Sequence, residues 1–355
     1  MQFGIAIPPA ADSWHLVRRA EDLGFSCAWF FDTQLLSADP LVAMAATAMK
    51  TTRIKLGTGV LIPSNRIAPV AANALASLNK LAPGRIVFGA STGFTGRRTM
   101  GLGAVKLADL EEYIGTVQAL WRGETVEMEL EGERRPIRML SPELGLINTE
   151  DAMPLFIAAS GPRSRKLTAK LGAGWIDNVA DAEAGAATLE RMHQAWQQAG
   201  RSRADLQAVA WTGGAVLEEG EPVDGPRGMA LAAPRAAMLL HRAADAALAA
   251  YPAPLAMRPE FAAAVEDYVA HARSFEPNSY YLSNHRGHLM FVRPDERPFI
   301  TAEMIRRTSF IGTAADLTQR VALLADAGFS QVVFSIPPGQ EHAIEDWGRI
   351  RRAFR

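Results

Sequence analysis

The chain has 355 residues, of which 48% are hydrophobic, and its formal net charge is -1. This content suffices to bury the core of one large domain, and the balanced charge gives no field that would favour nucleic acid or an anionic membrane. The single Cys27 excludes an internal disulfide and a cysteine metal cluster, which fits a reducing cytoplasm. No stretch approaches the roughly 18 apolar residues needed to span a bilayer. We therefore expect a cytoplasmic protein whose partner is a small molecule.

Eight strand-like runs alternate with helix-like stretches along the chain. They cover residues 3–7, 27–31, 54–60, 86–90, 155–159, 175–179, 206–216 and 331–336. Near-continuous apolar strands that alternate with amphipathic helices indicate a parallel sheet buried on both faces. Eight such units at this length favour an α/β fold of the closed (β/α)8 TIM-barrel type over an open doubly wound sheet.

Two connections are too long for ordinary barrel loops. Residues 122–153 contain an alternating segment that predicts a hairpin-like insertion, and residues 217–311, after the seventh strand, predict a helical lid insertion. Long insertions after barrel strands lie at the catalytic rim. The chain is therefore expected to be a single domain, 1–355, with these two insertions.

Glycine-rich turns follow the third and fourth predicted strands, at residues 57–60 and 89–93. In a parallel βαβ unit both strands end on the same side, so these turns would share one rim. Backbone without bulky side chains can approach a flat, polar cofactor closely. The sequence therefore predicts a cofactor site at this rim.

Several motifs together resemble one known family. They are Thr58-Gly-Val60, the run 81–89, the helix-like run 106–121 followed by Arg122-Gly-Glu124, and Ala159-Ser-Gly-Pro162 preceding Leu171-Gly-Ala173. With them the chain resembles, over nearly its whole length, the luciferase-like superfamily of flavin-dependent oxidoreductases. That superfamily includes luciferase-type monooxygenases, which use reduced FMN, and methylenetetrahydromethanopterin-reductase-like enzymes, which use the deazaflavin coenzyme F420.

The resemblance implies a cofactor site at the rim. It implies a non-proline cis peptide bond between Gly59 and Val60 that supports the flavin ring. It also implies a phosphate site at the start of a helix, where free N–H groups and the helix dipole favour an anion. The phosphate site would comprise Ala159, Ser160, Gly161, Pro162 and Arg163, faced by Asn178, and further cofactor contacts would come from Ala6, Asp32, Thr58, Ser91 and Thr92.

The catalytic residues are less clearly marked. Thr33 stands where many relatives have a histidine, and its hydroxyl can hydrogen-bond but cannot titrate near neutral pH. Phe94 stands where sugar-phosphate-oxidising relatives carry a glutamate, which argues against that activity. His285 and His288 are the remaining titratable candidates, with loop histidines bonded to backbone as the structural alternative.

A metal site is not predicted, because His285-x-x-His288 has no third ligand evident nearby. Substrate contacts are expected from four other side chains, Gln34, Arg98, Tyr280 and Tyr281.

These features favour a two-component monooxygenase that uses reduced FMN on a small organic substrate and is supplied by a separate reductase. The alternative is an F420-dependent reductase or dehydrogenase that transfers hydride. A non-catalytic flavin-binding protein and a flavin-free barrel enzyme acting on a phosphorylated metabolite also stay open. By analogy with the family, a homodimer is expected, with the alanine-rich segment 43–48 in close helix packing.

Overall fold

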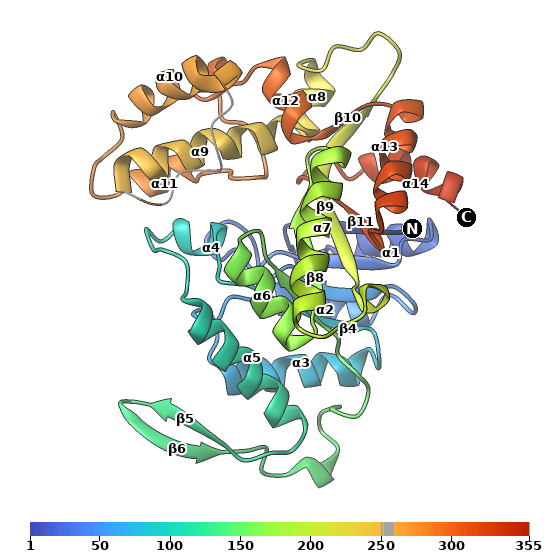
Figure 1. Cartoon of the computed structure of the whole chain (residues 1–355), viewed down its shortest axis with the longest axis vertical. Helices are drawn as coiled ribbons and strands as arrows, with labels where there is room; N and C mark the ends of the chain where they lie inside the picture. Colours follow the sequence, from blue (N-terminus) through green and yellow to red (C-terminus); the bar gives the residue numbers. More distant parts are fainter. Residues whose placement is uncertain (250, 252–258, 355) are drawn as a thin grey trace.

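Eight parallel strands close into a barrel in the computed structural model, which describes residues 1–249, 251 and 259–354 (Figure 1). Neighbouring strands follow chain order, and the ring closes where the eighth barrel strand pairs with both the first and the seventh. The strands are β1 (Gln2–Ile7), β2 (Cys27–Phe30), β3 (Lys55–Thr58), β4 (Ile86–Ala90), β7 (Leu155–Ala158), β8 (Gly174–Asn178), β9 (Ala208–Leu217) and β11 (Gln331–Ser335). The predicted α/β TIM barrel is confirmed.

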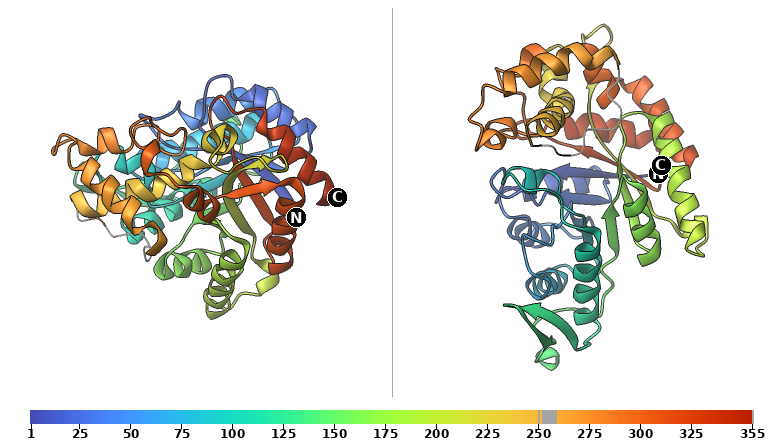
Figure 2. Two further views of the ribbon diagram at one scale, coloured as in Figure 1. Left: turned by 90° about the horizontal axis from the view of Figure 1, so that it is seen from above. Right: turned by 60° about the vertical axis from the view of Figure 1, so that its left-hand side comes forward.

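A ring of helices covers the outside of the barrel (Figure 2). These are α1 (Trp14–Asp22), α2 (Pro40–Ala48), α3 (Ala68–Leu81), α5 (Leu107–Trp121), α6 (Pro162–Leu171), α7 (Ala182–Gln198), α13 (Ala314–Ala327) and α14 (Ala343–Arg351). Local signals set their ends. Asp39 caps α2 by accepting a hydrogen bond from Leu41 N at 2.8 Å. Helices α6 and α13 end at Gly172 and Gly328, which have φ values of 64° and 109°.

Aromatic side chains fill the barrel interior. Trp29 packs edge-on against Phe156, with ring centroids 5.6 Å apart, and against Trp211 at 5.8 Å. Smaller residues such as Val209 and Val333 complete this buried cluster. The interior below the rim is thus a packed core, which leaves the carboxyl ends of the strands as the place for a site.

The two insertions lie at opposite ends of the barrel, so the expectation that both lie at the catalytic rim is wrong for residues 122–153, which follow helix α5 and not a strand (Figure 1). Within residues 122–153, β5 (Val126–Leu130) and β6 (Glu133–Ile137) form an antiparallel hairpin. The lid, defined here as residues 226–308, contains α8 (Pro226–Leu231), α9 (Ala233–Ala249), α10 (Ala262–Ala272), α11 (Tyr280–Asn284) and α12 (Ala302–Thr308). Strand β10 (Phe310–Thr313) then pairs with the end of β9. Residues 250 and 252–258 of the predicted insertion lie outside the described residues.

The lid sits over the rim next to the short helix α4 (Thr95–Arg98), which follows β4 (Figure 1). None of the helices in the described ranges combines the length and the apolar character that crossing a bilayer requires.

Candidate functional site

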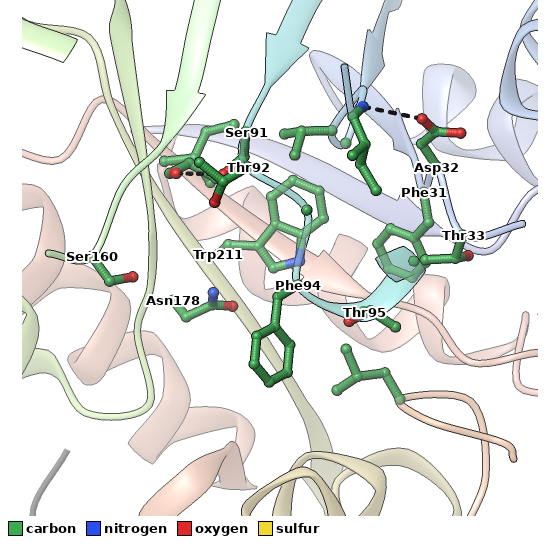
Figure 3. A pocket seen from close by; sticks show the side chains of 18 of the residues that line it. Phe31, Asp32, Thr33, Ser91, Thr92, Phe94, Thr95, Ser160, Asn178 and Trp211 are labelled. Carbon is green, nitrogen blue, oxygen red and sulfur yellow. Dashed lines mark hydrogen bonds between the residues drawn. The ribbon is translucent and has the colours of Figure 1, made fainter. Parts of the chain in front are cut away.

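A cavity of about 400 Å³ opens at the carboxyl ends of the barrel strands, below the lid (Figure 3). We call it the main cavity. Its wall includes residues that follow β2, β3, β4 and β7, side chains from β8, β9 and β11, and residues 288–290 of the lid. The strand ends supply most of the wall, so the barrel fixes the shape of the site.

Trp211 lines the main cavity and lies in the middle of the view in Figure 3. Its ring packs nearly parallel to Phe31, with centroids 5.9 Å apart, and its Nε1 donates to Ser335 Oγ at 3.1 Å. The Gly59–Val60 peptide bond beside it is cis, as predicted, and both residues line the cavity. A Cβ on Gly59 would lie 2.6 Å from the Trp211 ring, so glycine permits this close approach. That this surface supports a flavin ring stays a prediction.

One side of the main cavity carries the predicted phosphate site. Ser160, Gly161 and Asn178 line it, together with Ser164 in the first turn of α6, while Pro162 and Arg163 are exposed outside it. Ala159 lies beneath the surface, where its carbonyl accepts a hydrogen bond from Trp175 Nε1 at 2.7 Å. The motif thus contributes two of its five residues to the wall.

A buried carboxyl group lies behind this side. Ser160 Oγ donates to Asp177 Oδ1 at 3.3 Å, and burial raises the pKa of Asp177 to about 6. The ionisation state of Asp177 therefore changes near neutral pH, next to a surface that could hold an anion.

The opposite side carries Asp32 and Thr33, which line the main cavity (Figure 3). Ser91 and Thr92 also line it but lie on the side of Ser160, where Ser91 Oγ donates to Ala158 O at 2.9 Å. The Asp32 carboxylate is buried, and both of its oxygens have protein partners. It pairs with Arg66 Nη1 at 3.0 Å and accepts hydrogen bonds from Asn65 Nδ2 and Ile62 N. Thr33 Oγ1 lies 2.8 Å from Ser37 Oγ. Asp32 therefore fixes the turn after β2 and is not a free carboxylate facing the cavity.

The sequence profile of one family covers most of the barrel. The model of the luciferase-like monooxygenase family matches residues 4–221. The chain belongs to this family. The luciferase-like chain is 27% identical over 346 residues to 5,10-methylenetetrahydromethanopterin reductase of Archaeoglobus fulgidus, a match that covers 96% of this chain and 95% of the relative.

Two further comparisons give a similar picture. The luciferase-like chain is 34% identical over 211 residues to the F420-dependent hydroxymycolic acid dehydrogenase of Mycobacterium tuberculosis, covering 54% and 56% of the two chains. Among solved structures, the coenzyme F420 dependent tetrahydromethanopterin reductase from Methanopyrus kandleri superposes with a TM-score of 0.74 at 20% identity, over 100% of this chain and 99% of that one. The latter likeness shows the shared fold.

Several residues that the sequence places at the site of this luciferase-like chain lie elsewhere. Ala6 is buried in the barrel interior. Thr58 is also buried, and its Oγ1 accepts from Gly89 N at 2.9 Å and donates to Gly89 O at 2.8 Å, so it joins β3 to β4. Gln34 Nε2 donates to Gly96 O at 2.8 Å and so contacts α4. These three side chains support the rim and do not line the main cavity.

The remaining substrate candidates also lie outside the main cavity. Arg98 is buried and forms an ion pair with Asp245 of α9, and Tyr280 OH donates to the same carboxylate at 3.2 Å. Tyr281 stacks edge-on against Tyr280. The contacts of Arg98 and Tyr280 join α4, α9 and α11, so these two side chains attach the lid, while Tyr281 packs against Tyr280 within α11.

The two candidate histidines have different surroundings. His288 lines the main cavity, whereas His285 lies behind it with Nε2 3.0 Å from Asp245 Oδ1. Neither side chain bonds to backbone in the described part of the chain. Instead, Nδ1 of His288 lies 2.7 Å from Nδ1 of His241, a residue of α9 that the sequence reasoning missed. The spacing of His241 and Asp245, which puts both on one face of a helix, was the available signal.

Sequence reasoning also missed Trp211 and Arg235, which both line the main cavity. Arg235 Nε donates to Thr308 O at 3.1 Å, and burial lowers the pKa of Arg235 to about 10. Its guanidinium is a cation in the wall of the site. No sequence motif indicates that Arg235 belongs to the site, because Arg235 reaches the cavity only when α9 packs over the end of β9.

Proposed function

We propose that this protein is an F420-dependent oxidoreductase that transfers hydride to or from a small organic substrate in the main cavity. The observation that carries the proposal is the similarity to a reductase over 96% of the chain, which includes the lid as well as the barrel. The F420-dependent dehydrogenase relative supports the same cofactor. The sequence favoured a monooxygenase that uses reduced FMN, and the family's name agrees with it, but these relatives support the alternative better.

The residues of the main cavity fit a flat, anionic cofactor. The cis peptide at Gly59–Val60 and the rings of Phe31 and Trp211 would hold the ring system. Ser160, Ser164 and Asn178 would hydrogen-bond the phosphate, near the positive end of α6. When bound, a deazaflavin supplies hydride from the carbon that replaces N5 of a flavin.

The chain's own groups would bind and orient the substrate. Arg235 would attract an anionic group of the substrate, and His288 could hydrogen-bond it, because Nε2 of His288 has no partner among the described residues. Phe94, Leu289 and Met290 close the lid side with apolar surface, which would exclude water from the reacting atoms. Thr33 would orient a ligand by hydrogen bonding and would not exchange protons.

Anaerobic titrations with F420 and with FMN, each followed by fluorescence, test the cofactor assignment. We expect F420 to bind at least about tenfold more tightly than FMN, a difference of about 1.4 kcal/mol. Ser160→Ala and Asn178→Ala should weaken F420 binding. Arg163→Ala should have a smaller effect because its side chain lies outside the main cavity. Tighter binding of FMN would contradict the proposal, and binding of neither would favour a barrel enzyme without a flavin.

The reaction class needs a separate measurement. Oxidation of reduced F420 by a panel of carbonyl, imine and alkene substrates should proceed without oxygen. Arg235→Met should raise KM for anionic substrates more than for neutral ones. Turnover with reduced FMN that consumes oxygen would support the monooxygenase, and binding without turnover over a broad panel would support a carrier.

We also propose that a separate reductase keeps the cofactor reduced.

A further inference from the structure

Three buried histidines meet in the lid. His241 comes from α9, His285 from the end of α11, and His288 from the turn that follows. The Nδ1 atom of His288 lies 2.7 Å from Nδ1 of His241 and 3.4 Å from Nδ1 of His285. One ring nitrogen from each residue lies within 4.8 Å of the others. We call these residues the histidine cluster.

Carboxylates orient two of the three imidazoles. His241 Nε2 lies 2.9 Å from Glu296 Oε2, and His285 Nε2 lies 3.0 Å from Asp245 Oδ1. A carboxylate acceptor keeps the proton on Nε2, which leaves the Nδ1 lone pair of each ring directed into the cluster. Metal-binding histidines typically have this arrangement, with the second ring nitrogen donating to a carboxylate.

The carboxylates are themselves held in place. Arg293 donates to Glu296 from its backbone N at 2.9 Å and pairs with it through Nη2 at 3.0 Å. Asp245 Oδ1 accepts hydrogen bonds from Asn284 Nδ2 at 3.1 Å and from Tyr280 OH. The outer contacts therefore come from several elements of the lid, and they fix both imidazole rings before any ligand is present.

Hydrogen bonds among the three histidines cannot give every Nδ1 atom of the cluster a partner. With Nε2 protonated on His241 and His285, two unprotonated Nδ1 atoms face the single Nδ1 of His288, which can donate to only one of them. Nε2 of His288 has no hydrogen-bond partner among the described residues, so no contact fixes the tautomer of this ring, and Nδ1 can act as a ligand with the proton on Nε2.

We propose that His241, His285 and His288 bind a divalent transition-metal ion of the Zn²⁺ class through their Nδ1 atoms. Three zinc–nitrogen bonds of about 2.05 Å at tetrahedral angles place the nitrogens roughly 3.3 Å apart. This is close to the 3.4 Å between His285 and His288, whereas the 2.7 Å between His241 and His288 would have to widen on metal binding. Neutral imidazoles select zinc, cobalt or nickel over magnesium or calcium, which prefer oxygen ligands.

The ion would cross-link two elements of the lid above the main cavity. It would join α9 to the turn after α11, and the same turn places His288 in the cavity wall. The histidine cluster does not include the residues assigned to the cofactor phosphate. The metal site is therefore independent of whether F420 or FMN binds below it.

Metal binding by the purified 355-residue chain tests the proposal. The protein is first stripped with a chelator and then titrated with Zn²⁺. We expect one equivalent of zinc per chain and a midpoint of thermal unfolding that rises by several degrees with Zn²⁺ but not with Mg²⁺. Co²⁺ should give the visible ligand-field absorption of a low-symmetry, four-coordinate site with three nitrogen ligands and one water. Failure to bind Zn²⁺ or to shift the midpoint would overturn the proposal.

Substitutions distinguish zinc bound at the histidine cluster from zinc bound elsewhere on the protein. His241→Gln and His288→Gln should each abolish stoichiometric binding, and circular dichroism checks that they fold. Glu296→Gln keeps all three ligands and should weaken zinc binding by about 10- to 100-fold. His271→Gln is the matched control, because this lid histidine pairs with Asp295 and lies outside the cluster. Unchanged zinc binding by His241→Gln and His288→Gln would show surface binding and contradict the site.

Discussion

Arg98 of α4 and Asp245 of α9 form a buried ion pair, with Nε 3.7 Å from Oδ2, that joins the barrel rim to the lid. The guanidinium of Arg98 also lies over the ring of Tyr251, 3.1 Å from its centroid. Asp245 in turn orients His285. The pair therefore connects the turn after β4, through α9, to the histidine cluster.

Replacing Arg98 with leucine would leave the carboxylate of Asp245 buried without its cation. Removal of one partner of a buried pair typically costs about 3 kcal/mol, so we expect Arg98→Leu to lower the free energy of unfolding by about that amount. Urea denaturation measures the change, and limited proteolysis reports whether the lid loosens first. Arg122→Leu is the control, because Arg122 pairs with Glu124 on the surface and should change little. Equal effects of the two substitutions would contradict this role for Arg98.

Gly89 is required by the close contact of β3 and β4. A Cβ at this position would lie 2.0 Å from Thr58 O, so an alanine would force the two strands apart. We expect Gly89→Ala to destabilise the protein by about 3 kcal/mol and to weaken cofactor binding, since Thr58 precedes the cis peptide. Gly115→Ala in α5 is the control, because no atom lies within 4 Å of its added Cβ and alanine favours a helix. The midpoints of thermal unfolding of the two variants measure the difference in stability. Similar midpoints would contradict the steric argument for Gly89.

The barrel could be predicted because its signals are local. Each strand is a short apolar run, and glycines such as Gly172 and Gly328 mark the ends of helices within a few residues. The glycine-rich turn at Gly59 and Val60 was likewise visible, since it needs only the residues of one strand end.

The lid contacts could not be predicted, because they join residues far apart in sequence. His241 and His288 are 47 residues apart and meet only when α9 packs against the turn after α11. The same packing turns Tyr280 toward Asp245 and not toward the main cavity. The sequence therefore identified two members of the histidine cluster but neither its third member nor the carboxylates that orient it.

The raised pKa of Asp177 predicts a pH dependence of stability. Burial raises this pKa from 3.8 to about 6, although Thr188, Ser160 and Arg165 partly stabilise the charge. The folded protein thus binds the proton more tightly than the unfolded chain, so the free energy of unfolding falls as the pH rises from about 4 to about 6. Above that range the ionised Asp177 lowers stability by about 3 kcal/mol.

Asp177→Asn should remove this contribution, because the amide stays neutral at every pH. Urea denaturation of both proteins between pH 4 and pH 8 measures the difference, which should be largest above about pH 6. Asp205→Asn is the control, since Asp205 is exposed. A stability difference that did not grow between pH 4 and pH 6 would contradict the assignment to Asp177. If Ser160 binds the cofactor phosphate, affinity for the cofactor should also rise as Asp177 is protonated.

Helices α2 and α3 present apolar side chains to solvent on the surface where a homodimer is expected. Val42 is 63% exposed and Val70 is 52% exposed, and Met49 and Ile67 lie on the same two segments. Isolated apolar residues are normal on a surface, but several on adjoining helices indicate an interaction site. The small side chains of residues 43–48 would let a partner helix approach closely.

We therefore expect a dimer in solution, with an interface of the usual size of about 800 Å² per partner. Val42→Asp would bury an unpaired charge in that interface and should weaken dimerisation by about 3 kcal/mol, more than a hundredfold in the dissociation constant. Sedimentation and light scattering measure the molar mass. Leu323→Asp on α13 is the control, because Leu323 is 58% exposed but lies on another helix. A dimer that survives Val42→Asp and is lost in Leu323→Asp would place the interface on α13, because only the helix that carries the contact is disrupted by the new charge.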